Sequence, residues 1–302
     1  MASKIASLPR RCARIAFGPE STVYLSVNAN SGIVITAACA LAAKLADKRL
    51  FLHHHSYRYI GEWDRGMAML ANAGGKETVH ITNCPIMGRE LAERYPAVGR
   101  WASLHNAGSV DPNLSPNIRP DRPITLGHMS NLTEAKGVGR VVDAFERFKA
   151  RFPDGRLIVA GPARERFAQS TIDSARASFG EDFQYIGPVY GDAKKAFFEA
   201  IDIFVFPSLY RVETQGIVNL EALACGKPVV AFDQCCIGYD LGESGGEAIA
   251  KDGDFAAGLV HLAERSCVDW EEARHRARVR FDELFDLYSQ ERLNLLHEIG
   301  AA

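Results

Sequence analysis

The chain has 302 residues, of which 47% are hydrophobic and 24% are charged, and 35 lysines and arginines stand against 37 aspartates and glutamates. These values are ordinary for a globular protein, and they exclude a disordered, collagen-like or low-complexity chain. The near balance of charge provides no global attraction to nucleic acid or to an anionic membrane. At about 150 residues per domain, the length predicts two domains.

The cysteines number seven, and no two of them form a Cys-x-x-Cys pair. This pattern predicts neither a disulfide framework nor a zinc site, and it favours a reducing, cytoplasmic location. The longest apolar run, residues 33–43, is too short to span a bilayer. Residues 1–19 contain Pro9 and scattered basic side chains, and we expect a solvated arm with a weak attraction to acidic lipid at the inner face of the cell membrane.

Short apolar runs alternate with longer amphipathic ones along the first third of the chain. Strands are predicted at residues 22–27, 49–53, 78–82 and 100–104, and helices at residues 31–46, 62–72 and 86–95. This alternation predicts an α/β domain in which helices cover a parallel sheet.

A linker is predicted at residues 109–123, because four prolines fall among polar residues there. The alternation then resumes. Strands are predicted at residues 124–128, 156–160, 183–186, 203–206 and 228–232, and helices at residues 138–149, 164–177, 193–200 and 217–224, with a mostly helical tail from residue 255. A second α/β domain follows from this pattern.

The most informative segment is residues 206–230. A buried strand ends at Pro207, a loop with Gly216 follows, and a helix begins near Ile217. The backbone amides of Gln215, Gly216 and Ile217 are expected to point out of this helix start, and such a terminus binds phosphate. Glu213 and Glu221 stand on either side of it, which suits a ligand that carries both phosphate and hydroxyl groups.

This segment resembles the donor-site signature of glycosyltransferase family 4, the group 1 retaining glycosyltransferases, and the resemblance extends over nearly all of residues 124–298. It implies that Glu213 holds the donor sugar and that Glu221 binds the ribose of the nucleotide. The amides of Gln215, Gly216 and Ile217 would hold sugar and diphosphate. Lys136 would neutralise the diphosphate as it leaves. The plain alternative for the two glutamates is a solvated loop and a surface salt bridge.

The chain differs from the family pattern before Lys136 and resembles it at a histidine run in the N-terminal domain. Many members carry Gly-Arg five residues before the lysine, where this chain has Ser130 and Asn131, so Asn131 would hydrogen-bond the diphosphate without charge. Arg140 and Arg211 are candidates for the missing cation. In the N-terminal domain a family histidine faces the donor sugar, and here His54 or His55, within a His53–His55 run after a strand, would take that role. Asn106 resembles the turn that closes that domain.

The resemblance implies the GT-B fold, two Rossmann-like parallel-sheet domains facing a cleft. We expect a shortened acceptor-side domain over residues 1–108, the linker, and a nucleotide-sugar domain over residues 124–288. A C-terminal helix over residues 289–302 either crosses back to the first domain or packs on its own. The first domain lacks the opening strand and Gly-rich loop usual in the family, as in a compact variant or a sequence that starts late.

The function implied is metal-independent, retaining transfer of a hexose-type sugar from a UDP- or GDP-linked donor. The acceptor would be a glycan, lipid-linked or small-molecule hydroxyl in polysaccharide or glycoconjugate synthesis. No cofactor and no nucleic-acid partner are expected, and any membrane contact is weak and peripheral. The alternative is a nucleotide-sugar-binding protein without turnover, because the first domain is short and Asn131 replaces a cation.

Overall fold

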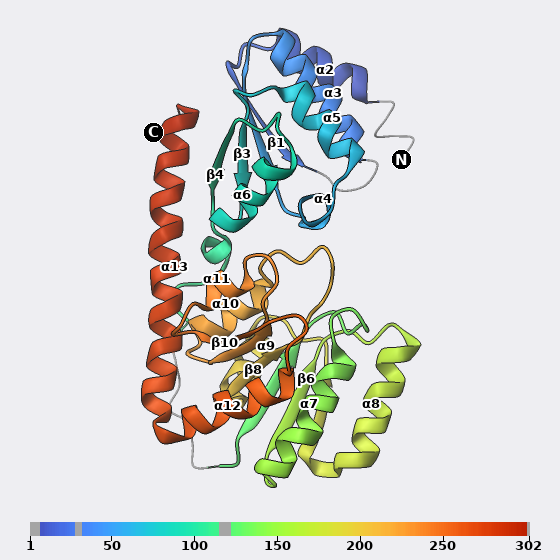
Figure 1. Ribbon diagram of the computed structural model, residues 1–302, viewed down its shortest axis with the longest axis vertical. Helices are drawn as coiled ribbons and strands as arrows, with labels where there is room; N and C mark the ends of the chain where they lie inside the picture. Colours follow the sequence, from blue (N-terminus) through green and yellow to red (C-terminus); the bar gives the residue numbers. More distant parts are fainter. Residues whose placement is uncertain (1–6, 28–31, 115–121, 301–302) are drawn as a thin grey trace. The chain divides into compact units, whose positions relative to one another are not determined.

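The computed structural model describes residues 7–27, 32–114 and 122–300 (Figure 1). Outside these ranges lie residues 115–121 of the predicted linker and the first residues of the predicted N-terminal arm. The chain divides into two compact units, residues 1–105 with 287–302, and residues 106–286. By this division the whole of the predicted linker, residues 109–123, groups with the second unit, and the last sixteen residues group with the first.

Unit 1 contains one sheet of four parallel strands in the order β1-β2-β3-β4. Its elements are α2 (Leu8–Phe17), β1 (Thr22–Val27), α3 (Gly32–Leu45), β2 (Arg49–His54), α4 (Arg58–Gly61), α5 (Arg65–Gly74), β3 (Val79–Thr82), α6 (Pro85–Arg94) and β4 (Arg100–Ser103). Because the strands follow one another in chain order, their right-handed crossovers put the connecting helices on one face.

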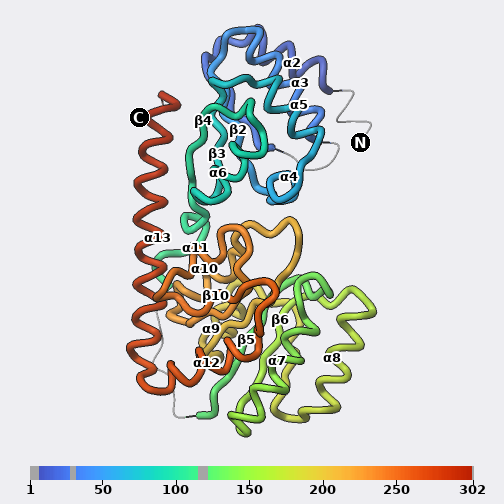
Figure 2. The backbone as a smooth tube through the Cα atoms, viewed as in Figure 1, coloured from blue at the N-terminus to red at the C-terminus, as the bar shows by residue number. Residues whose placement is uncertain are grey.

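The last helix covers the other face of this sheet. Helix α13 (Trp270–Ile299) belongs to unit 2 up to Asp286 and to unit 1 from Leu287 onward, and Figure 2 shows it as one uninterrupted helix. Its Leu295 packs with Phe51, Val79 and Ile81 of the sheet. Glu291 accepts a hydrogen bond from the backbone N–H of His105 at 2.8 Å, which fixes the helix to the end of β4.

The expectation of a solvated arm before the first strand is wrong for residues 8–17, which form α2 against α3. Pro9 is compatible with a helix because it stands in the first turn, where its missing N–H has no partner to lose. Leu8, Cys12 and Ile15 recur at helical spacing and are half-buried, whereas the arginines of this segment are exposed.

Unit 2 has six parallel strands in the order β10-β9-β8-β5-β6-β7. Its elements are η1 (Asn106–Ser109), β5 (Thr125–Met129), α7 (Val138–Arg151), β6 (Arg156–Ala160), α8 (Arg166–Phe179), η2 (Gly180–Asp182), β7 (Phe183–Gly187), α9 (Asp192–Ala200), β8 (Ile203–Phe206), α10 (Ile217–Ala224), β9 (Val229–Phe232), α11 (Ile237–Leu241), β10 (Gly246–Ile249) and α12 (Phe255–Val268).

The core of unit 2 follows the alternation of its strands. Alternate residues such as Leu126, Ile203 and Val205 join the apolar faces of α7, α8 and α12 in one buried cluster. The other face carries aromatic side chains, with the rings of Phe197 and Phe204 6.4 Å apart. Strand β10 was not predicted. It is short and begins at Gly246, where a β carbon would lie 1.8 Å from the carbonyl oxygen of Val229.

Candidate functional site

The strand order of the parallel sheet in unit 2 reverses between β5 and β8. Strands β6 and β7 continue to one side of β5, whereas β8, β9 and β10 lie on the other. At such a switch point the loops after the two central strands separate, and ligands bind at the carboxyl ends there. The loops that follow Met129 and Phe206 therefore form the candidate binding edge.

A pocket of about 580 Å³ lies among these loops. Its lining consists of Asn131, Thr133, Glu134, Ala135, Lys136, Arg140, Glu165, Leu209 and Tyr210. The structure thus brings the predicted residues Asn131 and Lys136 to one pocket, together with Arg140, and Arg211 is not part of this lining. The start of the 14-residue helix α7 adds positive potential at the same place.

Lys136 is held by an acidic and an aromatic neighbour. Its Nζ donates to Oε2 of Glu213, and it lies 4.9 Å from the ring centroid of Tyr210. Ser208 Oγ donates to the same carboxylate oxygen at 3.3 Å. Because only 19% of the Lys136 side chain and 12% of the Glu213 side chain are exposed, this ion pair is partly desolvated.

The other predicted donor-site residues surround the start of α10. Gly216 is its N-cap with φ +64°, and Ile217, the first helical residue, is exposed. The Gln215 side chain is buried and donates from Nε2 to Oδ1 of Asp240 at 3.3 Å. Glu221 forms an ion pair with Lys194, with 2.6 Å between Oε1 and Nζ. Neither Lys194 nor Tyr210 was identified from the sequence. Lys194 precedes Glu221 by 27 residues, and no local motif links these two residues.

The three consecutive histidines of unit 1 have different environments. His54 is fully buried, 3.1 Å from the Tyr59 hydroxyl and 2.9 Å from Nδ1 of His80. His53 is also buried, and its Nδ1 lies 2.5 Å from the Tyr24 hydroxyl. His55 follows β2 and is exposed. Of the two predicted candidates, His55 is therefore accessible and His54 lies in the interior.

Burial also sets the protonation of a histidine beside the pocket. His128 in β5 is fully buried, and desolvation lowers its pKa to about 4. The Nδ1 atom donates to the carbonyl of Val205 at 2.8 Å, so in the neutral ring Nε2 accepts from Ser130 Oγ at 2.9 Å. This contact ties Ser130, next to Asn131, to the centre of the sheet.

Acid is expected to destabilise the fold through these buried rings. Desolvation lowers the pKa of His53, His80 and His128 to about 4 from an ordinary 6.5. A depressed folded-state pKa contributes stability that is complete above pH 6.5 and is lost as the pH falls toward 4. We expect the free energy of unfolding in urea to be lower at pH 5.0 than at pH 7.5, by on the order of 1–2 kcal/mol per ring. His128→Asn should reduce this difference, and equal stability at both pH values would contradict the assignment.

Two features are absent from the residues that the structure describes. Among the side chains of residues 7–27, 32–114 and 122–300, no group of three or more His, Cys, Asp or Glu is placed to hold a metal ion. In the same part of the chain, no helix combines the length and apolar character needed to cross a bilayer.

A parallel sheet with a polar pocket and helix starts at its switch point gives unit 2 the architecture of a Rossmann-type α/β domain. The comparison with known families is more specific. Residues 112–253 match the family described as glycosyl transferases group 1.

Curated proteins are similar to part of this chain. The alpha-monoglucosyldiacylglycerol synthase of Acholeplasma laidlawii is 26% identical over 153 residues, which are 49% of this chain and 36% of that protein. The alpha-maltose-1-phosphate synthase of Mycobacterium tuberculosis is 31% identical over 171 residues, which are 52% of this chain and 40% of that protein. The matched regions thus span less than half the length of either relative.

Solved structures resemble a larger part of the chain. Anabaena HepE in complex with UDP has a TM-score of 0.73 at 17% identity, covering 94% of this chain and 81% of HepE. Sucrose-phosphate synthase from Thermosynechococcus elongatus has a TM-score of 0.72 at 16% identity, covering 99% and 80%. The predicted fold class is confirmed, because an α/β chain with two parallel sheets matches these GT-B structures.

Proposed function

We propose that the protein is a retaining glycosyltransferase that moves a hexose-type sugar from a UDP- or GDP-linked donor to a hydroxyl group. The acceptor would be a glycan, a lipid-linked glycan or a small molecule in polysaccharide or glycoconjugate synthesis. The observation that carries the proposal is the partly desolvated Lys136–Glu213 pair beside a pocket at the switch point of a domain that matches the group 1 family. HepE, which has a similar fold, was crystallised with UDP, and this supports the choice of donor.

The ion pair suggests how a donor would be held. A diphosphate entering beside Lys136 offers oxygens that can replace Glu213 as the partner of the ammonium group. The carboxylate of Glu213 would then be released to accept hydrogen bonds from sugar hydroxyls. When the glycosidic bond to the diphosphate breaks, negative charge grows on the leaving group, and Lys136 with the start of α7 would stabilise it.

The remaining roles are assigned to residues around this centre. Glu221 would leave Lys194 to bind the ribose, and the backbone near Gly216 would hold sugar and phosphate. Asn131 would hydrogen-bond the diphosphate, and Arg140, which lines the same pocket, would supply the second cation. His55 rather than His54 would face the donor sugar, because it is the exposed member of the run. Cationic side chains would serve as counter-charge here in place of a metal ion.

Nucleotide binding tests the donor site directly. Millimolar UDP or GDP is expected to raise the melting temperature of the wild-type chain, because a ligand that binds only the folded state stabilises it. Glu221→Ala should weaken nucleotide binding about 10- to 100-fold, as expected when a charged hydrogen bond worth about 1.5–3 kcal/mol is lost. The measurement is a thermal-shift titration.

The matched control is Lys194→Met, which breaks the same ion pair but keeps the Glu221 carboxylate. It should bind nucleotide at least as well as the wild type. If neither UDP nor GDP stabilises the wild-type chain, the donor proposal is wrong. Nucleotide binding with no transfer across a broad acceptor screen would instead favour the alternative of a binding protein without turnover.

Weak peripheral membrane association is also part of the proposal. Helix α2 exposes Arg10, Arg11 and Arg14, and Phe17 at its end is 88% exposed. A basic helix with an exposed aromatic residue suits the boundary between anionic headgroups and acyl chains. Such contact would bring the chain to lipid-linked acceptors.

A further inference from the structure

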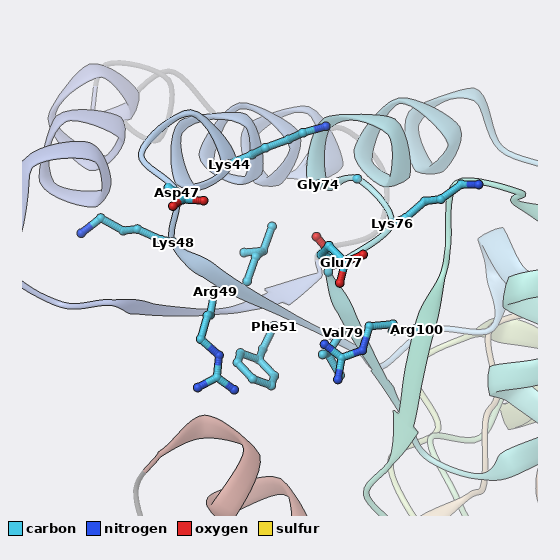
Figure 3. Close-up of a pocket in the computed structure, with 13 residues that line it drawn as sticks. Lys44, Asp47, Lys48, Arg49, Phe51, Gly74, Lys76, Glu77, Val79 and Arg100 are labelled. Atoms are coloured by element: carbon cyan, nitrogen blue, oxygen red, sulfur yellow. The ribbon is translucent and has the colours of Figure 1, made fainter.

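Unit 1 contains a second pocket that the proposed function does not use. It has a volume of about 520 Å³ and lies where β2, β3 and β4 begin. Figure 3 shows it between the loop at Gly74 and the strands, with Arg49 and Arg100 on either side of Phe51. His55 follows the opposite, carboxyl end of β2, so this pocket is separate from the edge of unit 1 assigned to the donor sugar.

The lining of this pocket is strongly basic. Five of its side chains are cationic, namely Lys44, Lys48, Arg49, Lys76 and Arg100, against the two carboxylates of Asp47 and Glu77. The lining therefore carries an excess of positive charge, which concentrates anions.

Three of these cations are not neutralised by ion pairs. Lys48 donates to the backbone carbonyls of Gly18 and Glu20, at 2.7 and 2.6 Å, and these bonds leave its charge uncompensated. Lys44 and Lys76 are exposed, and no carboxylate among the described residues lies within ion-pair distance of either. A polyvalent anion bound in the pocket would compensate these charges.

The two arginines are held in place by the end of α13. Arg100 forms an ion pair with Glu298 at 2.5 Å, and Arg49 donates to the backbone carbonyl of the same residue. The guanidinium of Arg49 also lies 5.7 Å from the centroid of Phe51. Both guanidinium groups are therefore oriented by contacts with the end of α13.

The loop opposite is shaped around a lysine. Gly75 has φ +80°, and a β carbon there would lie 2.8 Å from Nζ of Lys44. Glycine thus allows the ammonium group to lie directly over the backbone of the loop. Leu50, Phe51 and Val79 contribute the apolar part of the lining.

We propose that this pocket binds a phosphate-bearing anion, either a free polyphosphate compound or the phosphate headgroup of a lipid. Its volume is in the range of small-molecule sites. Lysine ammonium groups bind phosphate as point charges, so a cluster of them favours a ligand with several anionic oxygens.

Calorimetric titration of the full chain with inorganic pyrophosphate tests the proposal, with saturating UDP present to occupy the donor site. The variant Lys44→Gln/Lys76→Gln is expected to bind pyrophosphate at least tenfold more weakly. The control Lys195→Gln/Lys251→Gln removes the same charge from exposed positions of unit 2 and should leave the affinity within twofold. Circular dichroism confirms that both variants fold.

A parallel arm identifies the source of the phosphate. If a lipid headgroup is bound, the chain should cosediment with phosphatidylglycerol vesicles more than with phosphatidylcholine vesicles, and the difference should depend on Lys44 and Lys76. If the ligand is a free compound, only pyrophosphate binding should depend on these two lysines. The proposal is overturned if the wild type binds neither probe, or if both double variants lose affinity equally. Neither result alters the nucleotide titration of the Glu221 variants, so failure here is distinct from failure of the donor site.

Discussion

Replacing Lys136 with alanine is expected to lower kcat/KM for sugar transfer by about two to three orders of magnitude, the usual loss when one group that stabilises developing negative charge is removed. The expectation follows from the position of Nζ, which is paired with Glu213 and adjacent to the pocket at the switch point. The loss should appear mainly in kcat, because charge on the diphosphate increases as the glycosidic bond breaks. Steady-state kinetics with a UDP- or GDP-linked donor measure it.

Removing the lysine also leaves Glu213 without its cation, so stability has to be separated from catalysis. The double variant Lys136→Met/Glu213→Gln replaces the pair with neutral groups of similar size and removes the unpaired charge. It should fold about as stably as the wild type and yet remain deficient in transfer. Lys136→Arg keeps the charge and should retain part of the activity. Wild-type transfer by Lys136→Ala would remove this lysine from the mechanism.

The fold was predictable where burial alone determines the pattern. Strand β8 occupies the predicted residues, and helix α10 begins at Ile217 as expected. Continuous apolar runs of this kind belong to buried parallel strands. Helix α2 and strand β10 were missed because their sequence signals are weak. Helix α2 is short and basic, and β10 begins at a glycine that is needed because the backbone of Val229 passes close to it.

The site was predictable only in part, for a related reason. Lys136 and Glu213 are separated by 77 residues, and their pairing depends on the crossing of two loops that no local pattern describes. Resemblance to a family supplied both residues without supplying the contact. His54 and His55 could not be separated by alternation, because residues of both parities are buried in β2. Only the position at which the strand ends distinguishes them.

The Gly137→Ala variant is expected to lose about 2–5 kcal/mol of stability and most of its affinity for nucleotide. Gly137 is the N-cap of α7 with φ +87°, and a non-glycine residue there costs about 1–2 kcal/mol. A β carbon would also lie 2.3 Å from the carbonyl oxygen of Pro207, and such overpacking costs about 1–3 kcal/mol. The two loops cannot separate freely, because the Leu209 N–H donates to the Ala135 carbonyl at 3.1 Å. Any shift would therefore displace Lys136, which lies between Ala135 and Gly137.

Gly187→Ala provides the matched comparison. Gly187 has φ +73°, and a β carbon there would meet nothing within 4 Å. The substitution therefore incurs only the cost of a left-handed backbone conformation at a non-glycine residue. Urea unfolding should show a loss of about 1–2 kcal/mol for this variant, with unchanged nucleotide affinity. The difference between the two variants isolates the close approach of Gly137 to Pro207. If both variants lose the same stability and bind UDP equally well, the two loops do not meet at Gly137, and the positioning of Lys136 by this contact is wrong.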